Sequence, residues 1–153
     1  MLAAGAKAPS FSLIDASGQP CGLDDVLAGG PVLLALYKAG CPVCQLTMPF
    51  LERIAQGSLQ VVAISQDDPA VTARFQRAYG LSLRTLLDRE EEGYPVSNAF
   101  GITHVPSLFL VETDGTVSLA GAGFRKSELE QIGARAGVAP FRQQDNVPEW
   151  KAG

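Results

Sequence analysis

The stretch from Val32 to Cys44, VLLALYKAGCPVC, decides the fold because an apolar strand pattern runs directly into a pair of cysteines. Its first six residues, 32–37, are continuously apolar, as in a central strand that is covered on both faces of its sheet. A helix is predicted from Cys41 onward, with Pro42 in the first turn, where the missing proline N–H costs nothing. Apolar residues then recur at helical spacing, at Leu46, Phe50 and Ile54. The stretch therefore predicts a buried strand, a short loop and an amphipathic helix.

On either side of this stretch, strand patterns alternate with helix patterns, which is typical of an α/β domain. An Asp114-Gly115 turn predicts a hairpin, and Ser127 with Glu130 fits a capping box at the start of the last helix. The other predicted strands are 11–14, 59–65, 83–87, 107–111 and 116–119. The other predicted helices are 23–27, 69–79, 96–100 and 127–136.

The domain organisation follows from these patterns. We expect one α/β domain over residues 1–138, because 153 residues are enough for a single core of ordinary size. The remaining residues, 139–153, show no clear periodicity, so they are predicted to form a tail. This tail is expected to pack on the domain through Phe141 or Trp150.

Composition excludes several classes of protein. The chain has 12 Lys and Arg against 16 Asp and Glu, a net charge of −4, which argues against nucleic acid as a partner. No window is apolar for long enough to span a membrane. The first nine residues lack the apolar core of a signal peptide, so the sequence as it stands predicts a cytoplasmic protein. A periplasmic location is the alternative if a signal peptide has been removed.

The three cysteines are better explained by chemistry than by structural disulfides, because their number is small and odd. Two-residue spacing on a helical turn brings the sulfurs of Cys41 and Cys44 close enough to bond, and the helix start favours a thiolate at Cys41. Cys41 is therefore the predicted nucleophile, and Cys44 would resolve the mixed disulfide. A zinc site would also need Cys21 and His104, and neither belongs to a paired ligand motif. We accordingly expect no metal and no other cofactor.

Three ordered segments resemble a known family: LLALYKAGCPVCQLTMPFL, AFGITHVPSLFLVETDG and GAKAPSFSLIDASGQP. Together they are similar to thioredoxin-fold thiol-disulfide oxidoreductases, in particular to TlpA/ResA-like proteins within the AhpC/TSA (peroxiredoxin-like) superfamily. This resemblance implies a three-layer α/β fold with a central mixed sheet flanked by helices. It also implies an N-terminal β extension, and an insertion between Ser65 and Ile102.

The same resemblance assigns roles to the residues around the cysteine pair. Val105 and Pro106 match the cis-proline loop, which packs against the active-site disulfide and pairs with the backbone of a substrate. Pro42 and Val43, the dipeptide between the cysteines, are candidate substrate-binding or positioning residues, together with Val105 and Pro106. Pro49 matches the kink proline of the active-site helix. The implied partners are protein thiols and disulfides as substrates, and a redox partner protein that recycles the site.

The sequence departs from the family where acidic residues are expected. Ala35 stands where thioredoxins bury an acid in the strand, and Thr47 stands where TlpA/ResA-like proteins often carry one. Gly40 replaces the usual aromatic residue before the first cysteine. Two other residues are candidates for tuning the thiolate: Lys38, three residues before Cys41, and His104, beside the proline loop.

Two other functions stay open on the sequence alone. A peroxiredoxin-like thiol peroxidase, with antioxidant activity, would use a threonine three residues before its reactive cysteine, and this chain has Lys38 before Cys41 and Cys41 before Cys44. A metal carrier or interaction module on a thioredoxin scaffold would need no catalysis. Cys21 is most simply a small packed residue in all of these cases.

Overall fold

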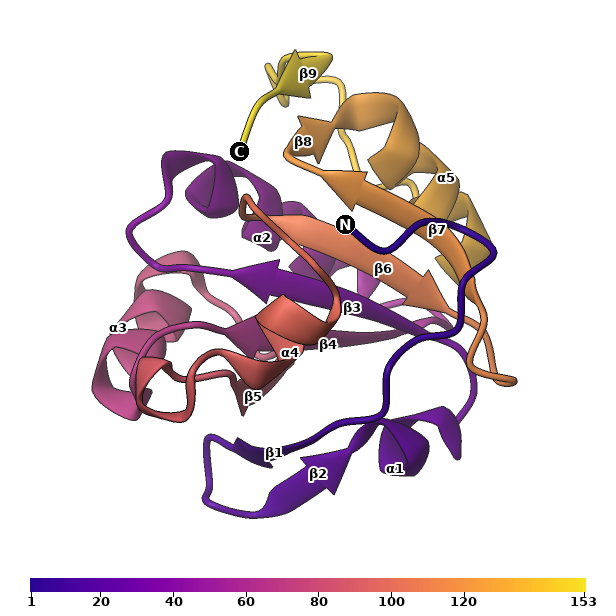
Figure 1. Cartoon of the computed structure of the whole chain (residues 1–153). Helices are drawn as coiled ribbons and strands as arrows, with labels where there is room; N and C mark the ends of the chain where they lie inside the picture. The colour runs from indigo at the N-terminus through magenta and orange to yellow at the C-terminus, as the bar shows by residue number, and fades with distance from the viewer.

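The computed structural model describes all residues from 1 to 153 and contains a seven-stranded mixed sheet. The strand order is β2-β1-β5-β4-β3-β6-β7 (Figure 1). The strands are β1 (Ser12–Asp15), β2 (Pro20–Gly22), β3 (Val32–Tyr37), β4 (Gln60–Ser65), β5 (Arg84–Leu87), β6 (Ser107–Val111) and β7 (Val117–Ala122). β3, β4 and β5 are parallel, and β1, β2, β6 and β7 join them in antiparallel pairs. A separate two-stranded ladder pairs β8 (Phe124–Arg125) with β9 (Trp150–Lys151).

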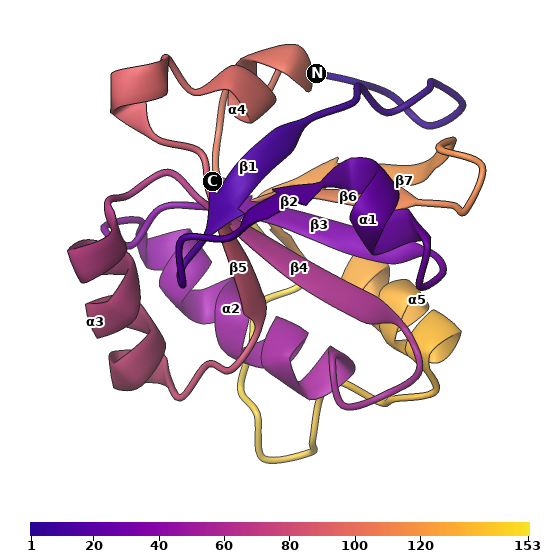
Figure 2. The ribbon, with the colours of Figure 1, turned by 90° about the horizontal axis from the view of Figure 1, so that it is seen from below.

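Helices cover both faces of this sheet, which gives three layers. They are α1 (Leu23–Leu27), α2 (Pro42–Ile54), α3 (Pro69–Tyr79), α4 (Pro95–Ala99) and α5 (Lys126–Ala136), with a 3₁₀ turn η1 at Glu90–Glu92. Seen from below, α2, α3 and α5 lie on one side of the sheet, and α4 and the N-terminal segment lie on the other (Figure 2). No helix combines the length and the apolar character that crossing a bilayer requires.

The sequence of the central strand β3 is continuously apolar because both faces of the strand are buried. Side chains alternate between the two faces of a strand. Leu33, Ala35 and Tyr37 contribute to the core under α2 and α5, whereas the alternate residues Val32, Leu34 and Leu36 contribute to the core on the opposite face. All six residues of β3 are buried. The predicted thioredoxin-like α/β class is confirmed, and the β1–β2 hairpin forms the expected N-terminal β extension.

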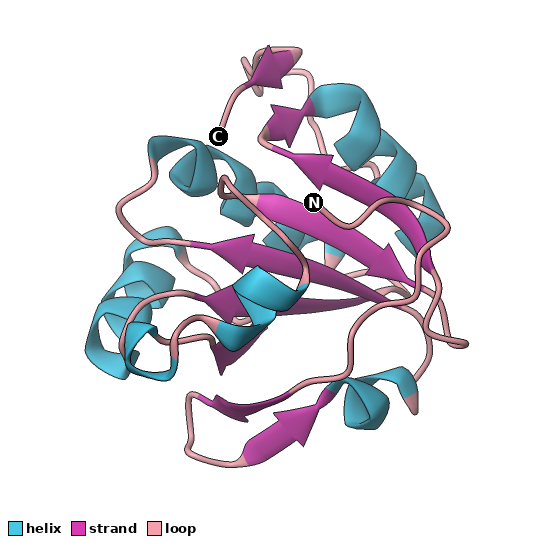
Figure 3. Cartoon of the chain, viewed as in Figure 1, coloured by secondary structure: helices cyan, strands magenta, loops and turns pink.

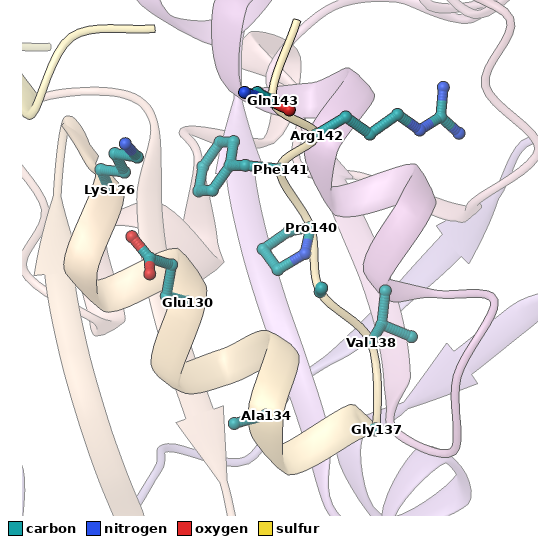
Figure 4. A pocket seen from close by; sticks show the side chains of 10 residues that line it. Lys126, Glu130, Ala134, Gly137, Val138, Pro140, Phe141, Arg142 and Gln143 are labelled. Carbon is teal, nitrogen blue, oxygen red and sulfur yellow. The ribbon is translucent and has the colours of Figure 1, made fainter. Parts of the chain in front are cut away.

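The segment after α5 packs on the domain through Phe141, as the sequence predicts. The Phe141 ring lies 4.8 Å from that of Phe50 and 6.0 Å from that of Phe124, measured between ring centroids. Figure 4 shows Pro140 and Phe141 beside α5, where they help to line a cavity of about 570 Å³. Trp150, the alternative to Phe141, does not pack in this way: the residue is 56% exposed, and its backbone pairs in the β8–β9 ladder.

The predicted capping box is also wrong. Helix α5 begins one residue earlier, at Lys126, with Arg125 as its N-cap and no side-chain cap. The reason is that another segment of the chain supplies the partner: the Lys126 N–H donates to the carbonyl of Glu149 at 2.9 Å. The segment that leads into β9 runs beside the start of α5 (Figure 3). Its Glu149 carbonyl satisfies an amide there, so no side chain is needed for that amide.

Replacing Phe124 by alanine should test the aromatic cluster that joins the last segment to the core. Phe124 is fully buried, and its ring also lies 6.2 Å from that of Phe50. We expect the free energy of unfolding to fall by about 3–5 kcal/mol, the usual cost of deleting a buried phenyl ring. Urea unfolding measures this loss, with the exposed Trp150→Ala variant as control. A loss no larger than that of the control would contradict the packing described here.

Candidate active site

The two cysteines lie at the start of α2, just after the loop that follows β3. Cys41 is the N-cap residue of α2, in an extended conformation, and Pro42 occupies the first turn. The Sγ atom of Cys41 accepts a hydrogen bond from the Cys44 N–H at 3.2 Å. The first turn of a helix has unpaired N–H groups and the positive end of the helix dipole, and both favour negative charge. The half-buried sulfur of Cys41 thus lies in a position suited to an anion.

The proline loop faces this sulfur. The Val105–Pro106 peptide bond is cis, as the resemblance predicts. The Cys41 thiol donates to the Val105 carbonyl, with 3.4 Å between sulfur and oxygen. Sheet register explains the approach: β3 and β6 are antiparallel neighbours with Leu36 opposite Ser107, so the end of β3 meets the start of β6. Two segments more than 60 residues apart are brought together in this way.

Cys44 lies one turn deeper and is fully buried. Burial raises the pKa of the Cys44 thiol well above its ordinary value, despite the opposing effect of the Lys38 backbone, and Cys41 and Asp67 raise it further. Both cysteines are free thiols in the structure. The site therefore pairs one accessible sulfur with one that is held protonated in the core.

A buried thiol makes stability depend on pH in the reduced protein. Below pH 9.0, the ordinary pKa of a thiol, Cys44 is protonated in both the folded and the unfolded state. Its full contribution to the free energy of unfolding is therefore present there. As pH rises above this value, the unfolded chain loses the proton first. The free energy of unfolding should then fall by up to about 1.4 kcal/mol per pH unit for this group. Tyr37, whose pKa burial raises to about 12, adds a similar loss above pH 10.0.

Urea unfolding of the reduced protein between pH 7 and 10 measures this effect. Cys44→Ala should make the decline above pH 9 shallower. Cys21→Ala is the matched comparison: burial also raises the pKa of Cys21, but less, so this variant should flatten the decline less than Cys44→Ala does. A decline that Cys44→Ala leaves unchanged would contradict the assignment.

The two candidate tuning residues lie at the edge of the site. The Lys38 side chain is exposed, and the residue acts on Cys44 through its backbone. His104 is also exposed, and its Nδ1 lies 2.9 Å from the hydroxyl of Thr103. It lines a cavity of about 430 Å³ together with Cys41 and Val105. Neither side chain makes a hydrogen bond to a cysteine.

The positions of the missing acids are occupied by buried residues of other kinds. Ala35 packs in the core, and the Thr47 hydroxyl donates to the Val43 carbonyl at 2.7 Å. Asp67 is a nearby carboxylate that sequence reasoning missed. Its Oδ2 accepts from the Ala39 N–H at 2.7 Å, within the loop before Cys41. A sequence signal existed, because Asp67 follows β4, and neighbouring parallel strands end at the same edge of a sheet.

Cys21 lies apart from this site. It is buried in β2 and contributes to the core on the face of the sheet opposite to that of Cys44. The structure contains no group of three or more His, Cys, Asp or Glu side chains arranged to hold a metal ion.

Comparison with known proteins shows to which family this chain belongs. The family model described as "AhpC/TSA family" matches residues 4–120. The chain belongs to this family. A thiol-disulfide oxidoreductase ResA of Geobacillus thermodenitrificans is 26% identical over 136 residues, which are 85% of this chain and 76% of that protein. The ResA of Halalkalibacterium halodurans is 30% identical over 119 residues, 74% of this chain and 65% of that protein. AhpC/TSA relatives of this chain therefore include thiol-disulfide oxidoreductases.

Another relative has a different kind of name. A Mycobacterium tuberculosis protein named as a peroxiredoxin is 32% identical over 133 residues, 78% of this chain and 84% of that protein. Among solved structures, the thioredoxin domain of a Bacteroides vulgatus thiol-disulfide oxidoreductase superposes with a TM-score of 0.77 at 21% identity, covering 88% of this chain and 98% of that one. The AhpC/TSA chain thus has the thioredoxin fold and is homologous to thiol-disulfide oxidoreductases.

Proposed function

We propose that this protein exchanges a Cys41–Cys44 dithiol and disulfide with protein substrates through a mixed disulfide. The observation that carries the proposal is the arrangement of one accessible sulfur at a helix start, 3.4 Å from the Val105 carbonyl, above a buried second thiol. An accessible nucleophile and a protected resolving thiol are the two parts that such an exchange needs.

The exchange balances in atoms and electrons. In the reducing direction, the Cys41 thiolate attacks one sulfur of the substrate disulfide, and the other substrate sulfur leaves as a thiolate. The Cys44 thiol then gives up its proton to solvent, and its sulfur attacks Cys41. The second substrate sulfur leaves, and a Cys41–Cys44 disulfide remains. Two electrons have passed to the substrate, and a dithiol of a redox partner protein returns them. The oxidising direction is the reverse sequence.

Neighbouring residues would position the reacting sulfurs and the substrate. The backbone carbonyl of Val105 would lie beside the extended chain of a protein substrate, with Pro106 fixing the loop. Pro42 and Val43 would set the start of the helix between the cysteines. Lys38 and His104 stay candidates for tuning, through charge near the loop and at the rim of the cavity.

Insulin reduction tests the proposal directly. Catalytic amounts of the protein should accelerate the reduction of insulin disulfides by dithiothreitol, which is followed as turbidity. A rate equal to that of dithiothreitol alone would contradict a reductase function. An oxidising function would then be tested with a reduced protein substrate and the oxidised form of this protein.

A thiol peroxidase is the second candidate, because a relative named as a peroxiredoxin is 32% identical to this chain. In that reaction the Cys41 thiolate would attack a peroxide oxygen, a sulfenic acid would form with release of water or an alcohol, and Cys44 would condense with it to a disulfide. Thiol-dependent consumption of hydrogen peroxide well above that of free cysteine would favour this function. Activity toward insulin without peroxide consumption would exclude it.

A further inference from the structure

The last five residues of the chain run across the face that holds the active site. Trp150 and Lys151 form β9 and pair with β8 in antiparallel register, with Phe124 opposite Lys151. The ladder begins at Glu149, whose carbonyl accepts from Lys126. In Figure 1 the C-terminus lies beside the N-terminal end of α2 and the loop before β6. The segment 149–153 therefore leads from the end of the domain directly to the site.

Gly123 allows this segment to pass close to the backbone. Its φ of +76° favours glycine, and a Cβ there would lie 2.5 Å from the Lys151 carbonyl oxygen and 3.1 Å from the Gly153 nitrogen. The Gly123 N–H donates to the carbonyl of Pro106 at 2.9 Å. The chain end thus crosses over a glycine that is itself tied to the proline loop.

Gly153 completes the approach. It lines the same cavity as Cys41 and Val105, and a Cβ on Gly153 would overlap the Val105 carbonyl oxygen. The same oxygen accepts the hydrogen bond from the Cys41 thiol. The end of the segment lies against the backbone atom beside which the proposed mechanism places a substrate.

We propose that residues 149–153 form a specificity-determining wall of the substrate site. This inference rests on the proposed function. The segment occupies the β8 side of the site, where an extended protein substrate would otherwise lie beside Val105. Tyr94, Asn98 and His104 also line the cavity that contains Cys41. Small disulfides reach Cys41 through this cavity, whereas a bulky protein disulfide competes with the segment.

The segment is held weakly enough for a substrate to compete with it. Its ladder has only two residues on each strand, and the Trp150 side chain is 56% exposed. The ion pair between Lys126 and Glu149 has its ends 3.6 Å apart, and the glutamate is largely exposed. Exposed ion pairs of this kind contribute little to stability.

Two variants test the wall, each assayed with insulin and with oxidised glutathione as a small disulfide. Gly153→Val adds a side chain where the Val105 carbonyl leaves no room, so the end of the segment must move away from Val105. A deletion of residues 149–153 removes the wall entirely. We expect kcat/KM for insulin to rise about fivefold, the effect of removing roughly one kcal/mol of competition, and kcat/KM for oxidised glutathione to change less than about twofold. Ala28→Val, at an exposed position far from the site, is the control for an added valine.

The outcomes separate this inference from the proposed function. If the wild-type protein reduces insulin and both variants leave the ratio of the two kcat/KM values unchanged, the wall is refuted. A fall of the insulin value would refute it as well, because the segment would then contribute to binding. If the wild-type protein reduces neither disulfide, the proposed function fails first. Circular dichroism checks that the deletion variant is folded, and Gly153→Val carries the test if it is not.

Discussion

Replacing Cys41 by serine should reduce insulin reduction to the rate of dithiothreitol alone, a loss of at least about 10³-fold, the scale seen when a catalytic nucleophile is removed. A serine hydroxyl is not ionised at neutral pH and forms no disulfide. The fold should not suffer, because serine is a good N-cap residue and Cys41 occupies the N-cap of α2. The assay therefore isolates chemistry from stability.

The control for this variant is Cys21→Ala, which removes a thiol on the opposite face of the sheet. It should keep its activity. If Cys41→Ser kept more than a small fraction of the wild-type rate, or if Cys21→Ala lost activity without unfolding, Cys41 would not be the nucleophile.

Replacing Cys44 by alanine should stop the exchange halfway. Cys41 can still attack a substrate disulfide, but no second thiol can release the product, so the mixed disulfide accumulates. Turnover should fall to near the background rate, while one substrate molecule becomes bound to each protein molecule. Non-reducing electrophoresis and mass spectrometry detect this adduct.

An alanine at this buried site removes only one sulfur atom, so we expect the variant to fold. Cys41→Ser should form no adduct under the same conditions. Normal turnover by Cys44→Ala, without an accumulated adduct, would show that another group resolves the intermediate and would contradict the role of Cys44.

Local sequence patterns predicted the elements that build the site. The apolar run of β3 is buried on both faces, and Pro42 begins α2 directly after Cys41. These features depend on side-chain periodicity and on helix-start chemistry, both of which act over a few residues. The hairpin around Gly115 was predicted for the same reason, and β6 and β7 are antiparallel as expected.

Features that depend on distant pairing were predicted only where the family resemblance supplied them, as for the cis Val105–Pro106 loop. Asp67 was missed although it directly follows β4, because its approach to the active-site loop depends on the parallel register of β3 and β4. The strand β9 is two residues long, too short for a periodic signal. The start of α5 was misplaced because its amide partner, Glu149, lies more than 20 residues further along the chain.

The most direct test of the central claim is mass spectrometry of the reduced protein after a single turnover with insulin. We expect a loss of two hydrogens, located on the peptide that contains Cys41 and Cys44, in proportion to the insulin disulfide reduced. Cys21 should stay a free thiol throughout. Insulin reduction without a Cys41–Cys44 disulfide, or with a disulfide that includes Cys21, would contradict the proposed exchange at Cys41 and Cys44.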